Sequence, residues 1–277
     1  MQQFNENGDA VDTKRNILEE IADRTRERVA EKKREVSLEE IKKQALSKKL
    51  DRTFLFEAAL KKSELGFICE VKKASPSKGL IAADFPYIEI AKEYEEGGAA
   101  AISCLTEPYY FQGENRFLEE IVSVVSIPVL RKDFTVDEYM IYEAKVLGAS
   151  AILLICSILD DRQLKEYFQI ADQLGLSVLV ETHTEEEVKR ALASGARLIG
   201  VNNRNLKTFQ VDLEHSVALK KMIPDDVIFI SESGIKTKED IKYLHEIGTD
   251  AVLIGETFMR ASNKRQVLED LVSLVRG

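Results

Sequence analysis

Eight nearly continuous apolar runs, each four to seven residues long, recur along the chain from residue 66 onward. They begin at Gly66, Ala99, Ile127, Ser150, Leu176, Arg197, Val227 and Asp250. The apolar residues of each run follow one another instead of alternating with polar ones, which is typical of strands buried on both faces of a parallel sheet. The pattern therefore predicts eight parallel strands.

Helical stretches separate these runs. Thr135 with Glu138, and Thr184 with Glu187, have the spacing of a capping box and predict the starts of two helices. At five places a glycine ends a helical stretch just before a strand, where a left-handed backbone costs glycine least: Gly98, Gly148, Gly175, Gly195 and Gly248. This eightfold alternation, with no glycine-rich dinucleotide-binding turn, favours an α/β fold of the closed (β/α)8 TIM-barrel type over an open doubly wound sheet.

The part of the chain before the first run is helical and highly charged. Residues 1 to about 10 are expected to be disordered, and Ser37 with Glu40 marks the start of a second helix. Two basic pairs alternate with glutamates, which indicates a solvated helix face: Lys32-Lys33 and Lys42-Lys43. We predict an extension over residues 1–45, whose helices pack on the barrel after a disordered start, and a catalytic barrel domain over residues 46–277.

Composition excludes several classes of function. The formal net charge of −9 argues against a nucleic-acid-binding surface, so an anionic substrate would need local positive charge. The three cysteines lie far apart inside apolar runs and are expected to be buried free thiols, and the three histidines are scattered. We therefore expect no metal site. A polar N-terminus and the lack of a long apolar stretch predict a cytoplasmic protein without membrane contact.

Charged residues stand where four of the predicted strands end. The first run ends with Glu70 and Lys72, which the period of a strand places on one face, towards the barrel axis. The third, fifth and seventh runs end near Lys132, Glu181 and Glu232. Any one of these side chains could simply cap a strand or pair with a neighbouring helix. Because active sites of such barrels lie at the carboxyl ends of the strands, five together predict an ionic active site.

Glycines follow the last two strands in a pattern that fits a phosphate site. Ser233-Gly234 comes after the seventh strand and Gly255-Glu256 after the eighth, with a short helix expected from Glu256 to Met259. Backbone N–H groups at such a position can face an anion, and glycine allows a close approach. Either pair alone also occurs in ordinary turns, so the prediction depends on both.

Several motifs at these strand ends occur in the order typical of one enzyme family. They are Glu70-Val71-Lys72-Lys73-Ala74-Ser75-Pro76-Ser77-Lys78-Gly79, Thr106-Glu107-Pro108, Tyr110-Phe111-Gln112-Gly113, Leu130-Arg131-Lys132-Asp133-Phe134, Val180-Glu181, Gly200-Val201-Asn202-Asn203-Arg204, Glu232-Ser233-Gly234-Ile235 and Ile254-Gly255-Glu256. With them the chain resembles the indole-3-glycerol phosphate synthase family over nearly its whole length. The resemblance implies a ring-closing carboxy-lyase of tryptophan biosynthesis that works without a cofactor. Its substrate would be 1-(2-carboxyphenylamino)-1-deoxyribulose 5-phosphate, released as indole-3-glycerol phosphate, CO₂ and water.

The resemblance also implies roles for individual residues. Lys132 falls on the general acid, Glu181 and Lys72 on later proton transfers, and Glu70 and Asn202 on their support. The remaining matches are implied to bind substrate: Ser75, Phe111, Phe134, Arg204, Glu232, Ser233, Gly234, Gly255 and Glu256, the last through its backbone only. Lys72 and Arg204 are cations for the substrate carboxylate and phosphate. Phe111 and Phe134 either pack on the aniline ring or anchor their loops as core aromatics. His183 is either a plain loop residue or a partner of Glu181.

Two other functions remain open at this point. One is another phosphosugar barrel isomerase or lyase, which would need an acid–base pair placed for enolisation and has no use for an apolar ring pocket. The other is a non-catalytic barrel subunit, in which the ionic set should be broken, whereas here every position is filled. A monomer that acts on a small phosphorylated molecule is the expectation from this sequence.

Overall fold

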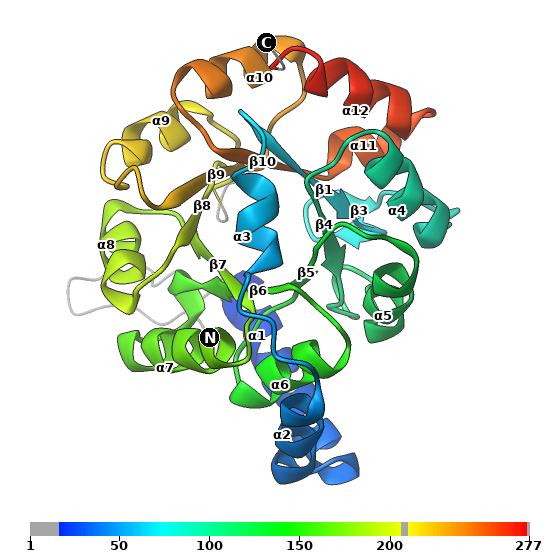
Figure 1. Ribbon diagram of the computed structural model, residues 1–277, viewed down its shortest axis with the longest axis vertical. Coiled ribbons are helices and arrows are strands. Elements are labelled where there is room, and N and C mark those ends of the chain that lie inside the picture. Colours follow the sequence, from blue (N-terminus) through cyan, green and yellow to red (C-terminus); the bar gives the residue numbers. More distant parts are fainter. Residues whose placement is uncertain (1–16, 206–209, 276–277) are drawn as a thin grey trace, which may run out of the picture.

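Eight parallel strands close into a barrel in the computed structural model, which describes residues 17–205 and 210–275 (Figure 1). The strands, in barrel order, are β1 (Gly66–Val71), β4 (Ala101–Leu105), β5 (Val129–Lys132), β6 (Ala151–Ile155), β7 (Ser177–Thr182), β8 (Leu198–Asn202), β9 (Ile228–Glu232) and β10 (Ala251–Ile254). The eight predicted strands and the predicted barrel are confirmed. A short antiparallel hairpin after β1, formed by β2 (Ala74–Ser75) and β3 (Gly79–Leu80), was not expected.

Helices surround the barrel and join successive strands (Figure 1). The outer helices are α4 (Tyr87–Glu96), α5 (Asn115–Val124), α6 (Glu138–Val146), α7 (Asp161–Gln173), α8 (Glu185–Ser194), α9 (Glu214–Lys220), α10 (Lys238–Glu246) and α12 (Lys264–Val272). A 3₁₀ turn, η1 (Cys156–Ile158), follows β6, and the expected short helix after β10 is α11 (Glu256–Arg260). The five glycines expected to be left-handed have φ between +71° and +93°.

The helix starts test the predicted caps. The hydroxyl of Thr184 accepts from the backbone N–H of Glu187, as expected for the start of α8. The prediction for Thr135 is wrong, because Asp137 is the N-cap of α6 and its side chain accepts from the N–H of Tyr139. Aspartate is among the strongest N-cap residues, and Asp137 directly precedes the first helical residue.

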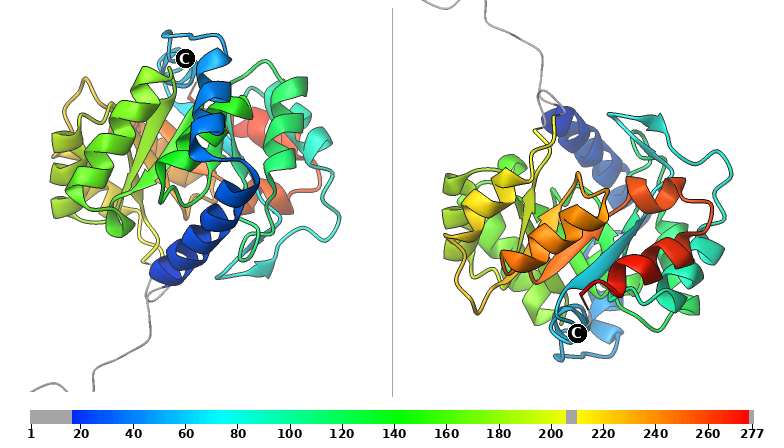
Figure 2. Two further views of the ribbon diagram at one scale, coloured as in Figure 1. Left: turned by 90° about the horizontal axis from the view of Figure 1, so that it is seen from below. Right: turned by 90° about the horizontal axis from the view of Figure 1, so that it is seen from above.

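Two helices precede the barrel. Ser37 caps α2 (Leu38–Ser47) as expected, and α1 (Ile17–Glu35) comes before it. Figure 2 shows α1 at one end of the barrel and α3 (Leu55–Leu60) at the other. The disorder expected for residues 1 to about 10 lies outside the described residues.

The lysines of the predicted solvated face remain partly in water, with 29%, 32% and 34% of the side chains of Lys32, Lys33 and Lys42 exposed, but these three also form ion pairs with the barrel. The acidic side chains of α6 and its cap point towards α1 and α2, and they pair with Lys32, Lys33 and Lys42. The nitrogen–oxygen distances are 2.5 Å for Lys32–Glu143, 2.7 Å for Lys33–Asp137 and 2.9 Å for Lys42–Glu138.

The interior of the barrel is a closed apolar cluster. Side chains from the strands, among them Leu130, Leu179 and Ile230, fill it between Phe56 and Leu60 of α3 at one end and Leu18 and Ile21 of α1 at the other. Removal of this surface from water stabilises the fold by about 25 cal/mol per Å². The three cysteines are buried and free, as expected. Within the described residues, no helix is both long enough and apolar enough to span a bilayer.

Candidate active site

A cavity of about 410 Å³ opens at the carboxyl ends of the strands. Every residue that the sequence marked for catalysis or substrate binding lines it: Glu70, Lys72, Ser75, Phe111, Lys132, Phe134, Glu181, Asn202, Arg204, Glu232, Ser233, Gly234, Gly255 and Glu256. These residues are far apart along the chain, and the barrel brings them together because each stands at or just after a strand end.

Lys132, at the end of β5, reaches across the barrel mouth to two carboxylates. Its Nζ donates to Oε2 of Glu232 at 2.9 Å and to Oε2 of Glu181 at 3.2 Å. Asn202 at the end of β8 donates from Nδ2 to the other oxygen of Glu181 at 3.2 Å. Side chains from β5, β7, β8 and β9 therefore form one charged cluster.

The cluster separates the protonation states of its members. Burial by itself would lower the pKa of Lys132, but the facing carboxylates, that of Glu232 foremost, outweigh it and hold this pKa above its ordinary value. Burial would likewise raise the pKa of Glu181, but the charges of Lys132 and His183 reverse the shift and keep this pKa low. Lys132 is thus a cation and Glu181 an anion throughout the neutral range.

Glu232 behaves differently from Glu181. Burial raises the pKa of Glu232 to about 7, with Lys132 opposing the shift and the Glu181 charge adding to it. Among the described residues, Oε1 of Glu232 has no hydrogen-bond partner. A Cβ at Gly200 would lie 2.0 Å from this oxygen, so only glycine leaves room for it. Glu232 can therefore exchange a proton near neutral pH.

Glu70 and Lys72 leave β1 on one face and form an ion pair, with 6% and 16% of their side chains exposed. Gly255 passes directly beside this pair. A Cβ at Gly255 would lie 2.3 Å from Oε1 of Glu70 and 3.0 Å from Nζ of Lys72. The glycine after β10 thus allows the ion pair to pack against the backbone at the cavity wall.

The polar end of the cavity lies beyond β9 and β10. Ser233 and Gly234 form a turn in which both have positive φ, +69° and +85°. Nδ2 of Asn203 donates to the carbonyl of Ser233 at 3.2 Å and holds this turn. Two cations that the sequence analysis missed, Lys236 and Arg260, also line the cavity here. They stand in the following loop and helix rather than at a strand end, so the strand pattern does not point to them.

Two further expected residues lie at the edge of this polar end. The carboxylate of Glu256 accepts from Nε of Arg260 at 3.0 Å and lies 3.8 Å from Nζ of Lys78, so its charge is compensated by cations. The backbone of Arg204 is anchored by its N–H, which donates to Oδ1 of Asn202 at 3.0 Å, and by a bridge to Val211.

The other end of the cavity is apolar. The rings of Phe111 and Phe134 lie 6.3 Å apart between centroids at an angle of 41°, and Ile17, Leu18 and Ile21 of α1 complete the wall. Phe134 is only 6% exposed and belongs to the apolar interior as well. It is therefore both a core aromatic and part of the cavity wall.

This arrangement defines a class of protein. Within the described ranges, no group of three or more His, Cys, Asp or Glu side chains is arranged to hold a metal ion. The chemistry available is that of ammonium, carboxylate and amide groups on a rigid frame. The fold and the cavity are those of a (β/α)8-barrel enzyme with its active site at the carboxyl ends of the strands.

Comparison with known proteins identifies the family. The sequence profile of the indole-3-glycerol phosphate synthase family matches residues 18–271. An indole-3-glycerol phosphate synthase of Ruminiclostridium cellulolyticum is 57% identical over 89% of this chain and 95% of its own length. One of Lachnoclostridium phytofermentans is 53% identical over 94% of this chain and 100% of its own length. The chain belongs to the indole-3-glycerol phosphate synthase family.

Solved structures of other enzymes share the fold. A 3-hexulose-6-phosphate synthase superimposes with a TM-score of 0.62 at 15% identity and covers 76% of this chain and 100% of its own. At this identity the likeness concerns the barrel alone.

Proposed function

We propose that this protein closes the pyrrole ring of indole-3-glycerol phosphate. It converts 1-(2-carboxyphenylamino)-1-deoxyribulose 5-phosphate into indole-3-glycerol phosphate, CO₂ and water, and needs no cofactor. Membership of the family supports the assignment. The observation that carries it is the position of Lys132. Its ammonium group is held by two carboxylates, and it lies between the aromatic wall of the cavity and the polar rim with its glycines and cations.

The first step suits Lys132 as the general acid. The ring carbon that bears the carboxylate attacks the substrate ketone, and negative charge develops on the ketone oxygen. An ammonium that stays protonated at neutral pH stabilises this charge and gives its proton to the oxygen. Loss of CO₂ then restores the aromatic ring.

The second step removes water. The new hydroxyl leaves with one proton, and the carbon that carries the nitrogen loses another as the double bond of the pyrrole forms. Glu232, with a pKa of about 7, is suited to donate to the leaving hydroxyl. Glu181 is ionised and suited to accept the carbon proton, with Asn202 fixing its orientation. Lys72, paired with Glu70, shares these proton transfers.

The two ends of the cavity match the two ends of this substrate. Phe111 and Phe134 enclose the aniline ring, and Lys72 faces the substrate carboxylate. Arg204 is the cation for the phosphate, aided by Lys236 and Arg260. The remaining phosphate contacts come from groups around the rim: Ser75, Ser233, Gly234, Gly255 and the backbone N–H of Glu256.

A fluorescence assay tests this proposal. The chain has no tryptophan, so an indole product stands out from the weak emission of its 8 tyrosines. On mixing with the substrate, we expect indole emission to appear together with an equal amount of CO₂. Absence of both from the folded wild-type protein would show that the proposed reaction is wrong.

We further propose that residues 1–45 are an extension that closes the pocket and that residues 46–277 are the catalytic domain. In support, α1 supplies apolar side chains to the cavity wall and ion pairs to the barrel, although α2 runs to Ser47, just past this boundary. We also propose a monomer in the cytoplasm that acts on one small phosphorylated molecule; in support, the described residues of one chain include all those assigned to the reaction.

A further inference from the structure

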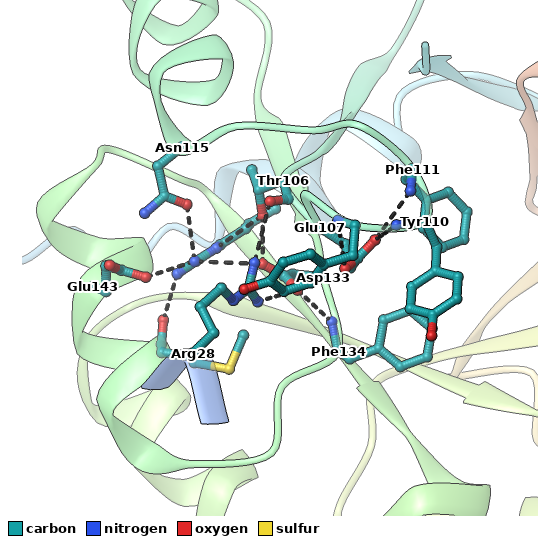
Figure 3. Close-up of polar contacts among 12 residues, drawn as sticks. Arg28, Thr106, Glu107, Tyr110, Phe111, Asn115, Asp133, Phe134 and Glu143 are labelled. Atoms are coloured by element: carbon teal, nitrogen blue, oxygen red, sulfur yellow. Dashed lines mark hydrogen bonds and ion pairs between the residues drawn. The ribbon is translucent and has the colours of Figure 1, made fainter. Parts of the chain in front are cut away.

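Buried carboxylates hold the two loops that carry the aromatic wall (Figure 3). The first is Glu107, which is 0% exposed. Its Oε2 accepts from the backbone N–H of Tyr110 at 2.7 Å and of Phe111 at 3.0 Å, and its Oε1 from that of Tyr109 at 3.0 Å. This single side chain thus sets the backbone that presents the Phe111 ring.

The second is Asp133, next to Lys132 and 1% exposed. Its Oδ1 accepts from the backbone N–H of Phe134 at 2.8 Å, and its Oδ2 accepts from the hydroxyl of Thr106 at 2.7 Å. Asp133 therefore sets the backbone that presents the Phe134 ring.

The cation closest to Asp133 comes from outside the barrel. Arg28 of α1 donates from Nη2 to Oδ1 of Asp133 at 2.8 Å and from Nη1 to the carbonyl of Thr106 at 3.4 Å (Figure 3). The Arg28 side chain is only 11% exposed, so this bond is largely shielded from water. Hydrogen bonds between charged groups are stronger than those between neutral groups.

The barrel has its own cation near Asp133, but that cation is engaged elsewhere. Nη2 of Arg131 lies 3.5 Å from Asp133, while it donates to Glu143 at 2.6 Å and to Asn115 at 3.0 Å. Without Arg28, the buried carboxylate of Asp133 would lose its nearest counter-charge. It would then turn towards Arg131, away from the N–H of Phe134.

We propose that Arg28 is a positioning residue which, through Asp133, holds Phe134 in place for the aromatic half of the substrate. The inference rests on the proposed function, because it assigns the aniline ring to the wall of Phe111 and Phe134. Arg28 itself does not line the cavity. It acts on the reaction through the carboxylate of Asp133 and, at a longer distance, the carbonyl of Thr106.

The geometry confines the effect to one end of the cavity. Lys132 is held by Glu181 and Glu232 on its far side, so its own position does not depend on Arg28. Among the described residues, the Arg28 side chain bonds to Asp133 and Thr106, whereas the polar rim follows β9 and β10. Loss of Arg28 should therefore weaken ring binding and KM more than kcat, and leave phosphate binding unchanged.

The test uses the full chain with Arg28→Met and two small probes. Anthranilate, followed by its own fluorescence, reports on the aromatic end, and inorganic phosphate, measured as an inhibitor, reports on the rim. We expect Arg28→Met to weaken anthranilate binding and raise KM by about tenfold, with kcat changed less than about threefold and phosphate unchanged. Arg28→Lys keeps the charge and should fall between Arg28→Met and wild type.

Arg26→Met is the matched control, since Arg26 is on the same helix in an exposed pair with Asp23 and should behave as wild type. Unchanged anthranilate binding in folded Arg28→Met, or equal weakening of both probes, would overturn the inference. If Arg28→Met does not fold, Arg28→Lys provides the test. An anthranilate affinity of Arg28→Lys equal to that of wild type would then overturn the inference. Anthranilate binding does not require turnover, so an inactive wild type would contradict the proposed function separately.

Discussion

The imidazole of His183 lies between two carboxylates, with Nε2 3.6 Å from Oε1 of Glu181 and Nδ1 3.5 Å from Oε2 of Glu187. Burial would lower the pKa of His183, but Glu187 and Glu181 outweigh it and raise this pKa. In turn, the imidazolium adds to Lys132 in keeping the pKa of Glu181 low. The residue directly after β7 thus helps to keep the proposed base ionised.

Replacement of His183 by Asn should move the pH profile. Without the imidazolium the pKa of Glu181 rises, so a base that must be ionised loses its charge at a higher pH. We expect the acid limb of kcat/KM to move towards neutral pH, with activity lost on the acid side of the profile and almost none lost at pH 8.5. His245→Asn, at a more exposed histidine beside Glu64, should keep the wild-type profile. An unmoved acid limb in His183→Asn would contradict the coupling.

Lys132→Ala removes the proposed general acid. We expect kcat to fall by roughly 10²–10⁴, the usual contribution of a positioned acid or base. Single-turnover indole formation measures the loss, and circular dichroism shows whether the barrel is intact. Activity within about tenfold of wild type would refute the role of Lys132.

Glu232→Gln should change how stability depends on pH. The pKa of Glu232 is about 7 in the fold and 4.5 as the ordinary reference value, so the unfolded chain ionises first as the pH rises. Between pH 4.5 and 7 the folded protein therefore binds more protons than the unfolded chain. As the pH rises through this range, Glu232 makes wild type progressively less stable.

In Glu232→Gln this loss of stability between pH 4.5 and 7 should be absent. The free energy of unfolding of the variant should therefore increase relative to that of wild type as the pH rises through that window, and the difference should level off above it. Urea unfolding at several pH values measures the difference. Glu186→Gln, at a side chain that is 75% exposed, should show no such trend. A parallel pH dependence of wild type and Glu232→Gln would show that Glu232 is not buried as an acid.

Deletion of residues 1–45 should weaken substrate binding more than it unfolds the barrel. The deletion removes the apolar side chains of Ile17, Leu18 and Ile21 from the cavity wall, while the strands keep their own hydrogen bonds. Circular dichroism measures the loss of structure, and KM measures the loss of substrate binding. Equal loss of structure and of substrate binding would contradict the prediction.

The strands and the ionic site were predictable because each has a local signal. A run such as Ser150 to Cys156 is apolar throughout, as a strand covered on both faces must be. Glu70 and Lys72 interrupt such a pattern with charge at a strand end, which is costly unless the charges are used. The hairpin of β2 and β3 has two residues in each strand, too few to show a period.

Contacts between distant segments could not be predicted in this way. Arg28 and Asp133 are 105 positions apart, and Lys32 looks like any surface lysine of a charged helix. What decides their contacts is the docking of α1, which a single sequence does not encode as a period or a motif. For His183, the sequence left open whether it is a loop residue or a partner of Glu181, and its place in the fold makes it both.

The docking of α1 has a consequence for biosynthesis. Because 105 positions separate Arg28 from Asp133, the helix leaves the ribosome roughly 5 to 20 s before its acceptor, at about 5–20 residues per second. During this interval it must stay in water by itself, which its many charged residues allow. The contacts that hold α1 therefore become available only after translation has passed α6, when the first helix can pack against the barrel.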